Sequence, residues 1–471
     1  MDQASNERQD QYLRRLLERY ARDVQIQEVG FYSEEDYDTL LAHFYATHDY
    51  DTTLALADQA IAQHSYCPDF YKWKALIHKI NLEEDEALAT LERLMFYAPN
   101  DEEALVLRLE VLIHFEQVDD ARELHTKLEG RLTGKPKRSL LAFFDGLLLL
   151  QEFETRKAWS AFVNAFRLDP RQEPALDELL NAPEFGYLRE DLERQLRRAV
   201  EHDPFNHLVW YYLGLWYDDN SQDEKALDAF SNARALDDQD LRYELDYADK
   251  LFDLEDYERA LATYAIYLAH PEAQENYETY MRLGRCHQLL GQLTPAKEAF
   301  FAAVRLEPEM YDIYQHLGEC FAAEERWGMA AYNYGRAVEQ PNHTATCWLG
   351  LALCQAATNE TEDAERAFRK AIAMDDGYSD AFVSYAIFLA DHGREQEARG
   401  ALVSALDRYE DASLLYGMVA VCLMTSRRQA ALRYLNEALS RYYDDQELLT
   451  EWYPNLRDDR EINAIFELYR P

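Results

Sequence analysis

The chain has 471 residues, of which 48% are hydrophobic, with 16 glycines and 13 prolines. This composition fits packed helices better than a disordered or a sheet-rich protein. The 89 acidic residues outnumber the 48 Lys and Arg residues and give a formal net charge of −41. Such a surface repels nucleic acid and anionic lipid and attracts basic protein segments, although the composition of a salt-adapted or GC-rich organism would look the same.

The chain begins with a predicted helix over residues 6–29. Its apolar side chains fall on one face at helical spacing: Tyr12, Leu13, Leu16, Leu17 and Tyr20. The first fifteen residues lack the apolar core of a secretory signal, and no stretch reaches the 18 apolar residues of a membrane span. We therefore expect residues 1–33 to form an N-terminal cap and the protein to be cytoplasmic.

A pair of short helices recurs along most of the chain. In residues 207–240, Trp210, Leu213, Gly214 and Tyr217 share one helix face, and an alanine-spaced run follows an acidic turn. A step of 34 residues in both directions finds the same pattern again. Twelve units begin near residues 34, 68, 102, 139, 173, 207, 241, 277, 311, 345, 379 and 413.

These units carry a known motif. Trp210, Leu213, Gly214 and Tyr217 form the pattern W-x2-L-G-x2-Y, and over residues 34–445 the chain resembles the tetratricopeptide repeat (TPR) family. The resemblance implies an all-α TPR solenoid, a right-handed superhelix of about twelve helix-turn-helix repeats with capping helices at both ends. Position 8 of nine units is Gly or Ala, as expected where the two helices of a unit approach closely.

The fifth unit departs from this pattern. Pro183 falls at its eleventh position and should end the first helix early. We interpret residues 173–206 as a distorted, cap-like repeat that divides the solenoid into segments 34–206 and 207–445, although simple drift of one repeat accounts for the pattern equally well. Residues 446–471 are predicted to be C-terminal capping helices.

The six cysteines form no C-x2-C pair. Four of them, Cys286, Cys320, Cys354 and Cys422, occupy position 10 of their units, where a small buried side chain is expected. The histidines show no metal-ligand spacing, and the phosphate-binding and nucleophile motifs are missing from the sequence. We therefore expect no catalytic residues, no cofactor, no metal site and no enzymatic activity.

In the TPR family, positions 2, 5, 9, 12 and 13 of each unit line a concave groove that holds peptides. This implies a candidate groove here with an acidic stretch, relieved by two arginines, and an apolar stretch. The acidic stretch and its arginines are Asp218, Asp219, Arg242, Asp249, Asp253, Arg285 and Glu319. The apolar stretch is Leu349, Leu353, Val383 and Ile387, and Leu140, Phe143, Leu147 and Leu150 form another. Either a partner helix or the chain's own terminus covers these apolar side chains, or tight winding buries them against the next repeat.

Two further features bear on partners. The co-chaperone branch of the family grips a carboxylate with Lys at position 5 and Asn at position 9, but Lys72 and Asn181 lie in different, non-adjacent units here. A chaperone-tail clamp is therefore not expected. Basic residues gather before residue 139 in an otherwise lysine-poor chain: Lys127, Arg131, Lys135, Lys137 and Arg138. This segment is either a solvated connection or a contact for the acidic groove or for an acidic protein.

The sequence thus predicts a non-enzymatic scaffold or adaptor that binds basic and apolar protein segments, with self-association left open. The alternative is a regulatory or targeting subunit whose enzyme or assembly machine lies in another chain. The segments "DYDTTLALADQAI" and "DYERALATY" are similar to those of long repeat proteins of Bacteroidota, which would imply a bacterial protein.

Overall fold

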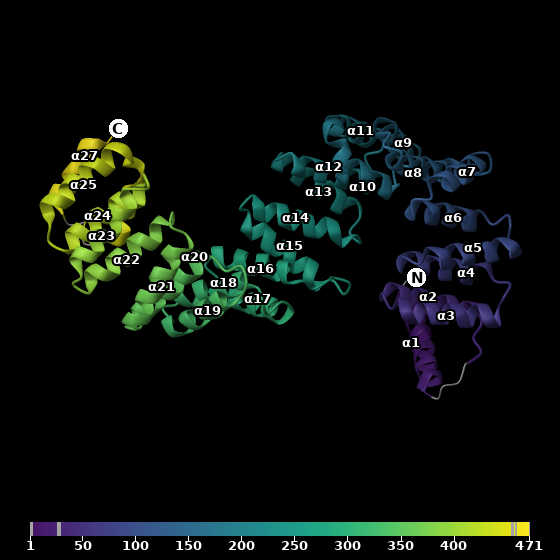
Figure 1. Ribbon diagram of the computed structural model, residues 1–471, viewed down its shortest axis with the longest axis horizontal. Coiled ribbons are helices and arrows are strands. Elements are labelled where there is room, and N and C mark those ends of the chain that lie inside the picture. Colours follow the sequence, from purple (N-terminus) through teal and green to yellow (C-terminus); the bar gives the residue numbers. More distant parts are fainter. Residues whose placement is uncertain (1–2, 26–29, 454–455, 457–458, 471) are drawn as a thin grey trace. The chain divides into compact units, whose positions relative to one another are not determined.

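The computed structural model describes residues 3–25, 30–453, 456 and 459–470. In this part of the chain no strand occurs, and the protein is 79% helical (Figure 1). The predicted all-α repeat solenoid is therefore confirmed. Helix hairpins follow one another along the sequence, and within each of the two compact units described below they pack against their neighbours in the chain.

Each repeat begins with an inner helix, here called helix A. The A helices are α2 (Glu34–Ala46), α4 (Pro68–Ile80), α6 (Glu102–His114), α8 (Lys135–Gln151), α10 (Glu173–Asn181), α12 (His207–Asp219), α14 (Leu241–Asp253), α16 (Tyr277–Leu289), α18 (Tyr311–Ala323), α20 (Ala345–Ala357), α22 (Ser379–Asp391) and α24 (Ala412–Met424).

The second helix of each repeat is helix B. The B helices are α3 (Tyr50–Gln63), α5 (Glu84–Tyr97), α7 (Val118–Glu129), α9 (Thr155–Leu168), α11 (Arg189–His202), α13 (Asp223–Leu236), α15 (Tyr257–Ala269), α17 (Leu293–Leu306), α19 (Trp327–Glu339), α21 (Thr361–Met374), α23 (Glu395–Leu406) and α25 (Arg428–Arg441). The twelve hairpins begin within a few residues of the twelve predicted units.

The turn from helix A to helix B has the same geometry in eleven repeats. In the second repeat, Leu82 has φ +61°, its N–H donates to the carbonyl of Lys79, and the N–H of Glu83 donates to that of His78. This is the Schellman arrangement, which satisfies the last carbonyls of helix A. The left-handed residues are His48, Leu82, Glu116, Phe153, Ser221, Glu255, Gly291, Glu325, Asn359, Gly393 and Ser426. Because nine of the eleven are not glycine, the sequence alone did not reveal this turn.

Close approach of helices A and B explains the glycines at position 8. A Cβ placed on Gly214 would lie 2.6 Å from the ring of Phe230, and one on Gly284 would lie 2.5 Å from that of Phe300. Both distances are shorter than any carbon–carbon contact that packing tolerates. The aromatic ring, sixteen residues downstream, therefore fills the space that a side chain would need.

The fifth repeat is distorted where Pro183 lies. Helix α10 has nine residues instead of thirteen, and a 3₁₀ helix, η1 (Pro183–Leu188), replaces the usual turn. The predicted early end of this helix is confirmed, because proline removes a backbone donor and clashes with the preceding turn. Phe185 in η1 is buried against Trp159 and Phe162, with ring centroids 5.2 and 6.0 Å away.

The structure divides into two compact units, residues 1–238 and 239–471. The predicted segment boundary at 206/207 stays a prediction. In the structure the distorted repeat supports the next one, because α12 packs on α10 and α11 and the hydroxyl of Tyr212 donates to Asp177. Whether residues 173–206 act as an internal cap stays a prediction.

Extra helices lie beside the first and last repeats. Helix α1 (Gln3–Gln25) packs against α2 through buried Leu16 and through Tyr20, whose ring lies 5.5 Å from that of Phe44. At the other end, α26 (Glu447–Trp452) and α27 (Arg460–Tyr469) follow a short 3₁₀ helix, η2 (Tyr443–Asp445). Leu449 on α26 and Ile462 on α27 are fully buried. Part of each predicted cap, residues 1–2, 26–29, 454–455, 457–458 and 471, lies outside the described residues.

Cys286, Cys320, Cys354 and Cys422 are buried between helices, with exposures of 1% or less, and they are free thiols. Their predicted packing role is confirmed. Burial raises the pKa of the Cys286 and Cys320 thiols to about 12, so neither forms a thiolate at neutral pH. Among the described residues, no helix combines the length and the apolar character that a membrane span requires.

Candidate partner-binding surfaces

The first unit contains an open apolar cavity of about 570 Å³ on the A-helix side. It is formed by α4, α6, α8 and the start of α10. Its lining residues are Lys79, Glu110, Ile113, His114, Glu116, Leu140, Phe143, Phe144, Leu147, Gln151, Gln172 and Pro174. Most of them occupy the groove positions of their repeats, and we call this the A-helix cavity.

Helix α8 supplies most of the apolar lining, and its one acidic residue does not face the cavity. Asp145 pairs with Arg122 of α7, with Nη1 and Oδ1 2.5 Å apart. Leu140, Phe143 and Leu147 are thus left to face the cavity, and all three are half-buried. The sequence named these three residues. It missed Ile113 and the residues contributed by α4 and α10, because these come together only when successive repeats stack.

The cavity also has polar groups at fixed places. Lys79 and Glu110 form an ion pair at its edge, with Nζ and Oε1 2.5 Å apart. The side-chain amide of Gln151 donates to the carbonyl of Ile113 at 2.7 Å, while its buried Oε1 accepts no hydrogen bond from the residues described. Leaving such an acceptor unpaired costs about 1–3 kcal/mol.

Lys72 cannot act as a carboxylate clamp in this arrangement. Its Nζ lies 3.1 Å from Asp69, 3.1 Å from Asp101 and 2.7 Å from Glu103. Three carboxylates already surround the one cation, so an incoming C-terminal carboxylate would be repelled. The geometry agrees with the sequence, which gave no support for a chaperone-tail clamp.

The acidic candidates are divided between the two units. Asp218 and Asp219 end α12 in the first unit, where Asp218 is half-buried and Asp219 is exposed. In the second unit, Arg242 is exposed and forms an ion pair with Asp240 at 2.6 Å. Arg242 therefore interacts locally with its own helix N-cap.

Asp249 is part of the internal framework of the second unit. It accepts a hydrogen bond from the hydroxyl of Tyr264, and its Oδ1 lies 3.1 Å from Nη1 of Arg282. Burial raises the pKa of Asp249 despite these contacts. Asp253, one turn later, is exposed and 4.0 Å from Arg282. Of the two carboxylates, Asp253 is the one that is accessible to a partner. Arg282, which contacts both, was not predicted from the sequence.

Arg285 lies on the exposed side of α16. Its guanidinium sits over the ring of Phe252, 5.2 Å from the centroid, and Arg282 lies over the same ring at 5.8 Å. Two cations on one aromatic ring form a local positive spot beside Asp253. The acidic stretch is therefore more mixed in charge than its sequence suggested.

Glu319 is held by three side chains. His316, Gln315 and Gln288 each hydrogen-bond its carboxylate at 2.9 Å. Burial by itself would raise the pKa of Glu319, but these hydrogen bonds outweigh it and lower the pKa to about 2. Glu319 thus links α16 and α18, and its charge is already satisfied within the protein.

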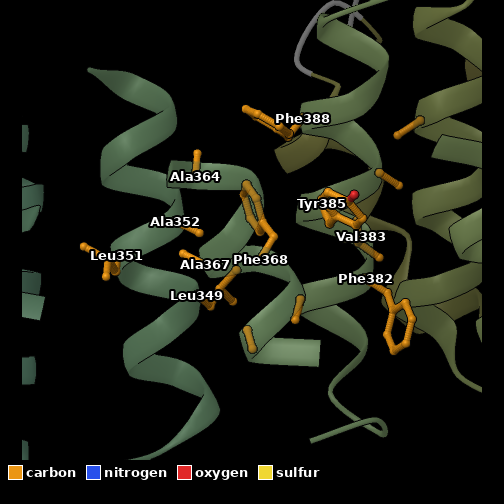
Figure 2. Close-up of a cluster of buried hydrophobic side chains, with 14 of the residues drawn as sticks. Leu349, Leu351, Ala352, Ala364, Ala367, Phe368, Phe382, Val383, Tyr385 and Phe388 are labelled. Atoms are coloured by element: carbon orange, nitrogen blue, oxygen red, sulfur yellow. The ribbon is translucent and has the colours of Figure 1, made fainter. Parts of the chain in front are cut away.

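The apolar candidates separate into two kinds. Leu349 and Val383 are 7% and 0% exposed, and Figure 2 shows both among the buried side chains around Phe368. A Cβ on Gly417 of the next A helix would lie 2.6 Å from Val383, which shows how closely the repeats stack there. Tight winding thus buries these two residues. Leu353 is 45% exposed and Ile387 is half-buried, so only these two remain available to a partner.

No cluster of His, Cys, Asp and Glu suited to a metal ion occurs among the residues that the structure describes. The surfaces described above offer apolar contacts, hydrogen-bonding groups and charge.

The sequence matches known repeat proteins. Residues 251–461 match the family model of the cilia- and flagella-associated protein 70 C-terminal domain, a TPR domain. The chain is 23% identical to the human Superkiller complex protein 3 over 61% of its own length, and 23% identical to tetratricopeptide repeat protein 37 of Xenopus laevis over 54%. It spans 18% and 16% of the lengths of these two relatives.

The structure is also similar to solved structures. A repeat protein of Parabacteroides merdae is 15% identical and covers 52% of this chain and 98% of its own, with a TM-score of 0.44. Yeast Tom70 is 14% identical and covers 84% of this chain and 97% of its own, with a TM-score of 0.35. The bacterial origin implied by the sequence resemblance stays a prediction.

Proposed function

Because the chain is a tetratricopeptide repeat protein, we propose that it is a non-enzymatic scaffold that holds segments of partner proteins against its A helices. The partner segment would carry one or more bulky apolar side chains with basic residues beside them. The observation that carries this proposal is the A-helix cavity of the first unit, where Leu140, Phe143 and Leu147 line an open apolar hollow.

Two features of the A-helix cavity and its surroundings support this proposal. The volume of the cavity suits one or two large side chains, and burial of each such side chain contributes about 1.5–3 kcal/mol. Glu116, beside the cavity, and the net charge of −41 favour a basic segment and speed its approach.

In the second unit, Leu353 and Ile387 are proposed as weaker apolar contacts, with Asp253 as an exposed acidic one. Asp219 has the corresponding role at the end of α12. The remaining candidates (Asp249, Glu319, Leu349 and Val383) are proposed to shape the surface from within.

The test is kinetic binding of a co-purifying partner to the full chain. Leu147→Asp should raise the dissociation rate by about thirtyfold or more, because a central apolar contact of an interface often carries 2 kcal/mol or more. Asp219→Lys together with Asp253→Lys should mainly slow association and weaken its salt dependence.

Leu82→Asp is the matched control, because Leu82 is 71% exposed in an A–B turn of the same unit. Circular dichroism should first show that each variant is as helical as the parent chain. If Leu147→Asp and Leu82→Asp bind with the rates of the parent chain, the partner does not use the A-helix cavity and the proposal fails.

A second function follows from one comparison. The human relative is named as a component of a complex, and the similarity extends over 61% of the present chain. We therefore retain the proposal of a regulatory or targeting subunit whose activity resides in another chain. It would be favoured if the co-purifying partner were an enzyme whose rate or localisation changes when Leu147→Asp removes binding.

We also propose that the protein works in the cytoplasm. Six free thiols, of which five are buried, suit a reducing compartment better than an oxidising one. Fractionation of cells that produce the tagged chain tests this location.

A further inference from the structure

A cluster of exposed aromatic side chains lies on the edge of the first unit that carries the turns between repeats. Tyr66 in the turn after α3 is 80% exposed, and Phe96 at the end of α5 is 83% exposed. Both rings contact Tyr97 edge-on, with centroids 5.6 and 5.5 Å apart. Tyr97 is itself 45% exposed and rests on buried Tyr71. Three touching, exposed rings form an apolar patch, unlike the isolated exposed side chains that any surface contains.

The basic segment 127–138 lies beside this patch. Five of its twelve residues are Lys or Arg and one is acidic, in a chain whose net charge is −41. Arg131 reaches back to the turn that follows Tyr97, where its Nη2 donates to the amide oxygen of Asn100 at 3.2 Å. Because that amide is neutral, the contact leaves the charge of Arg131 uncompensated. Arg93, one turn before Tyr97 on α5, is exposed on the same edge.

Two cations of this segment are already paired within the protein, Lys127 with Glu123 and Lys137 with Glu102. Lys135, Lys137 and Arg138 occupy the first turn of α8, where the helix dipole is positive and acidic residues are favoured. Helices α2 and α6 carry two or three acidic residues in the same place, whereas α8 carries none. A cation in this turn that has no carboxylate partner costs about 0.3–1 kcal/mol at low salt, and an anion bound from outside would recover this cost.

We propose that Tyr66, Phe96 and Tyr97, together with Arg93, Arg131 and Lys135, form a second docking site that takes an acidic protein segment with an apolar side chain. The aromatic patch anchors the apolar side chain, and the cations hold the flanking carboxylates. The occupant is acidic because this patch is basic. Elsewhere the surface of the chain is acidic and repels anionic partners, so such a segment binds only here. A short acidic segment suffers that repulsion less than a nucleic acid, whose charge extends far beyond the patch. The site is separate from the A-helix cavity and does not depend on it.

The experiment selects a random peptide library on the intact chain and measures the affinity of the enriched peptide by fluorescence anisotropy. We expect peptides with several Asp or Glu residues around one Leu, Phe or Ile. Phe96→Ala with Tyr66→Ala should weaken binding by about tenfold or more, as loss of a central aromatic anchor usually does. Arg131→Glu with Lys135→Glu should weaken it similarly and remove most of the salt dependence.

Two matched controls distinguish this site from a general effect of charge and from the A-helix cavity. Lys157→Glu with Lys225→Glu changes the net charge by the same amount elsewhere in the unit and should leave affinity within about twofold. Leu147→Asp, which blocks the A-helix cavity, should bind the acidic peptide as tightly as the parent chain does. The proposal of this second site is therefore tested separately from the proposal of the cavity.

Four results would overturn the proposal. The first is a library that yields no acidic peptide. The second is an enriched peptide that binds the Arg131→Glu, Lys135→Glu variant as tightly as the parent chain. The third is a single-stranded 20-nucleotide probe that binds more tightly than the peptide through the same residues. The fourth is a parent chain that self-associates in sedimentation experiments while the charge variant does not. The surface would then bind a second copy of the chain and not an acidic segment of another protein.

Discussion

Individual residues carry backbone strain that the repeat pattern tolerates. Phe153 adopts φ +61° in the turn between α8 and α9 and is 91% exposed. Its side chain gains little from packing there, while the left-handed conformation costs a non-glycine residue about 1 kcal/mol. The turn is kept because its Schellman hydrogen bonds satisfy the end of α8.

Phe153→Gly should therefore be more stable than Phe153→Ala by about 0.5–1 kcal/mol, because both remove the ring and only glycine relieves the strain. In an ordinary helical position the order would be reversed. Urea midpoints of the two variants measure the difference. Equal midpoints, or a more stable alanine variant, would show that the left-handed turn is not strained.

Glu319 gives a residue-scale prediction for pH. Its pKa in the folded protein is about 2, below its ordinary value of 4.5, so its ionised form stabilises the fold. This stabilisation is fully present above pH 4.5 and is lost as the pH falls toward 2. We expect Glu319→Gln to lower stability by about 1–2 kcal/mol at pH 7 and by roughly half as much at pH 3.

The measurement is the urea midpoint of the parent chain and the variant at both pH values. Asp253→Asn, which removes an exposed carboxylate from the same unit, is the control and should change little at either pH. A difference for Glu319→Gln that stays the same at pH 7 and pH 3 would contradict the proposed hydrogen-bonded carboxylate.

At the scale of the element, the spacing between helices A and B depends on one missing side chain. Gly284 lies in α16 with the ring of Phe300 where its Cβ would be, whereas Gly335 lies in α19 with nothing within 4 Å of such a Cβ. The two glycines have the same helical backbone and opposite surroundings. Their substitution therefore separates packing from helix propensity.

We predict that Gly284→Ala destabilises the second unit by about 1–3 kcal/mol through overpacking. Gly335→Ala should stabilise it by about 0.5–1 kcal/mol, since alanine loses less entropy in a helix. Thermal unfolding followed by circular dichroism distinguishes the two. If both substitutions stabilise, the helices can separate at no cost and the close approach is not required.

At the scale of the whole molecule, stability comes from contacts between neighbouring repeats. Helix α12 covers α10 and α11, and Tyr212 connects back to Asp177. These contacts keep the sixth repeat with the first five, although Pro183 distorts the fifth. The stability of a fragment should consequently depend on whether this repeat is included.

A fragment of residues 1–238 should unfold at a higher urea concentration than a fragment of residues 1–206. The shorter fragment lacks the helices that pack on α11, so the apolar side of α11 is exposed in it. If residues 173–206 were an internal cap, α11 would be stable without those helices. Equal midpoints would support the cap interpretation of residues 173–206 and place the boundary at 206/207. Hydrogen exchange of α11 in the two fragments gives a second, local readout.

The repeat, its period, the buried cysteines and the early end at Pro183 could be determined from the sequence alone. They follow from local spacing, because each repeat contacts only its neighbours and buries the same positions every time. For the same reason the sequence correctly placed Leu140, Phe143 and Leu147 on one surface.

Only the tertiary structure decided which of the groove positions remain accessible. Leu349 and Leu353 are four residues apart on one helix face, yet the first is 7% exposed and the second 45%. Likewise, Asp249 and Glu319 have found partners on neighbouring helices that no spacing within one repeat reveals. Accessibility and charge pairing depend on how successive repeats meet, and that depends on side-chain shapes at many positions at once.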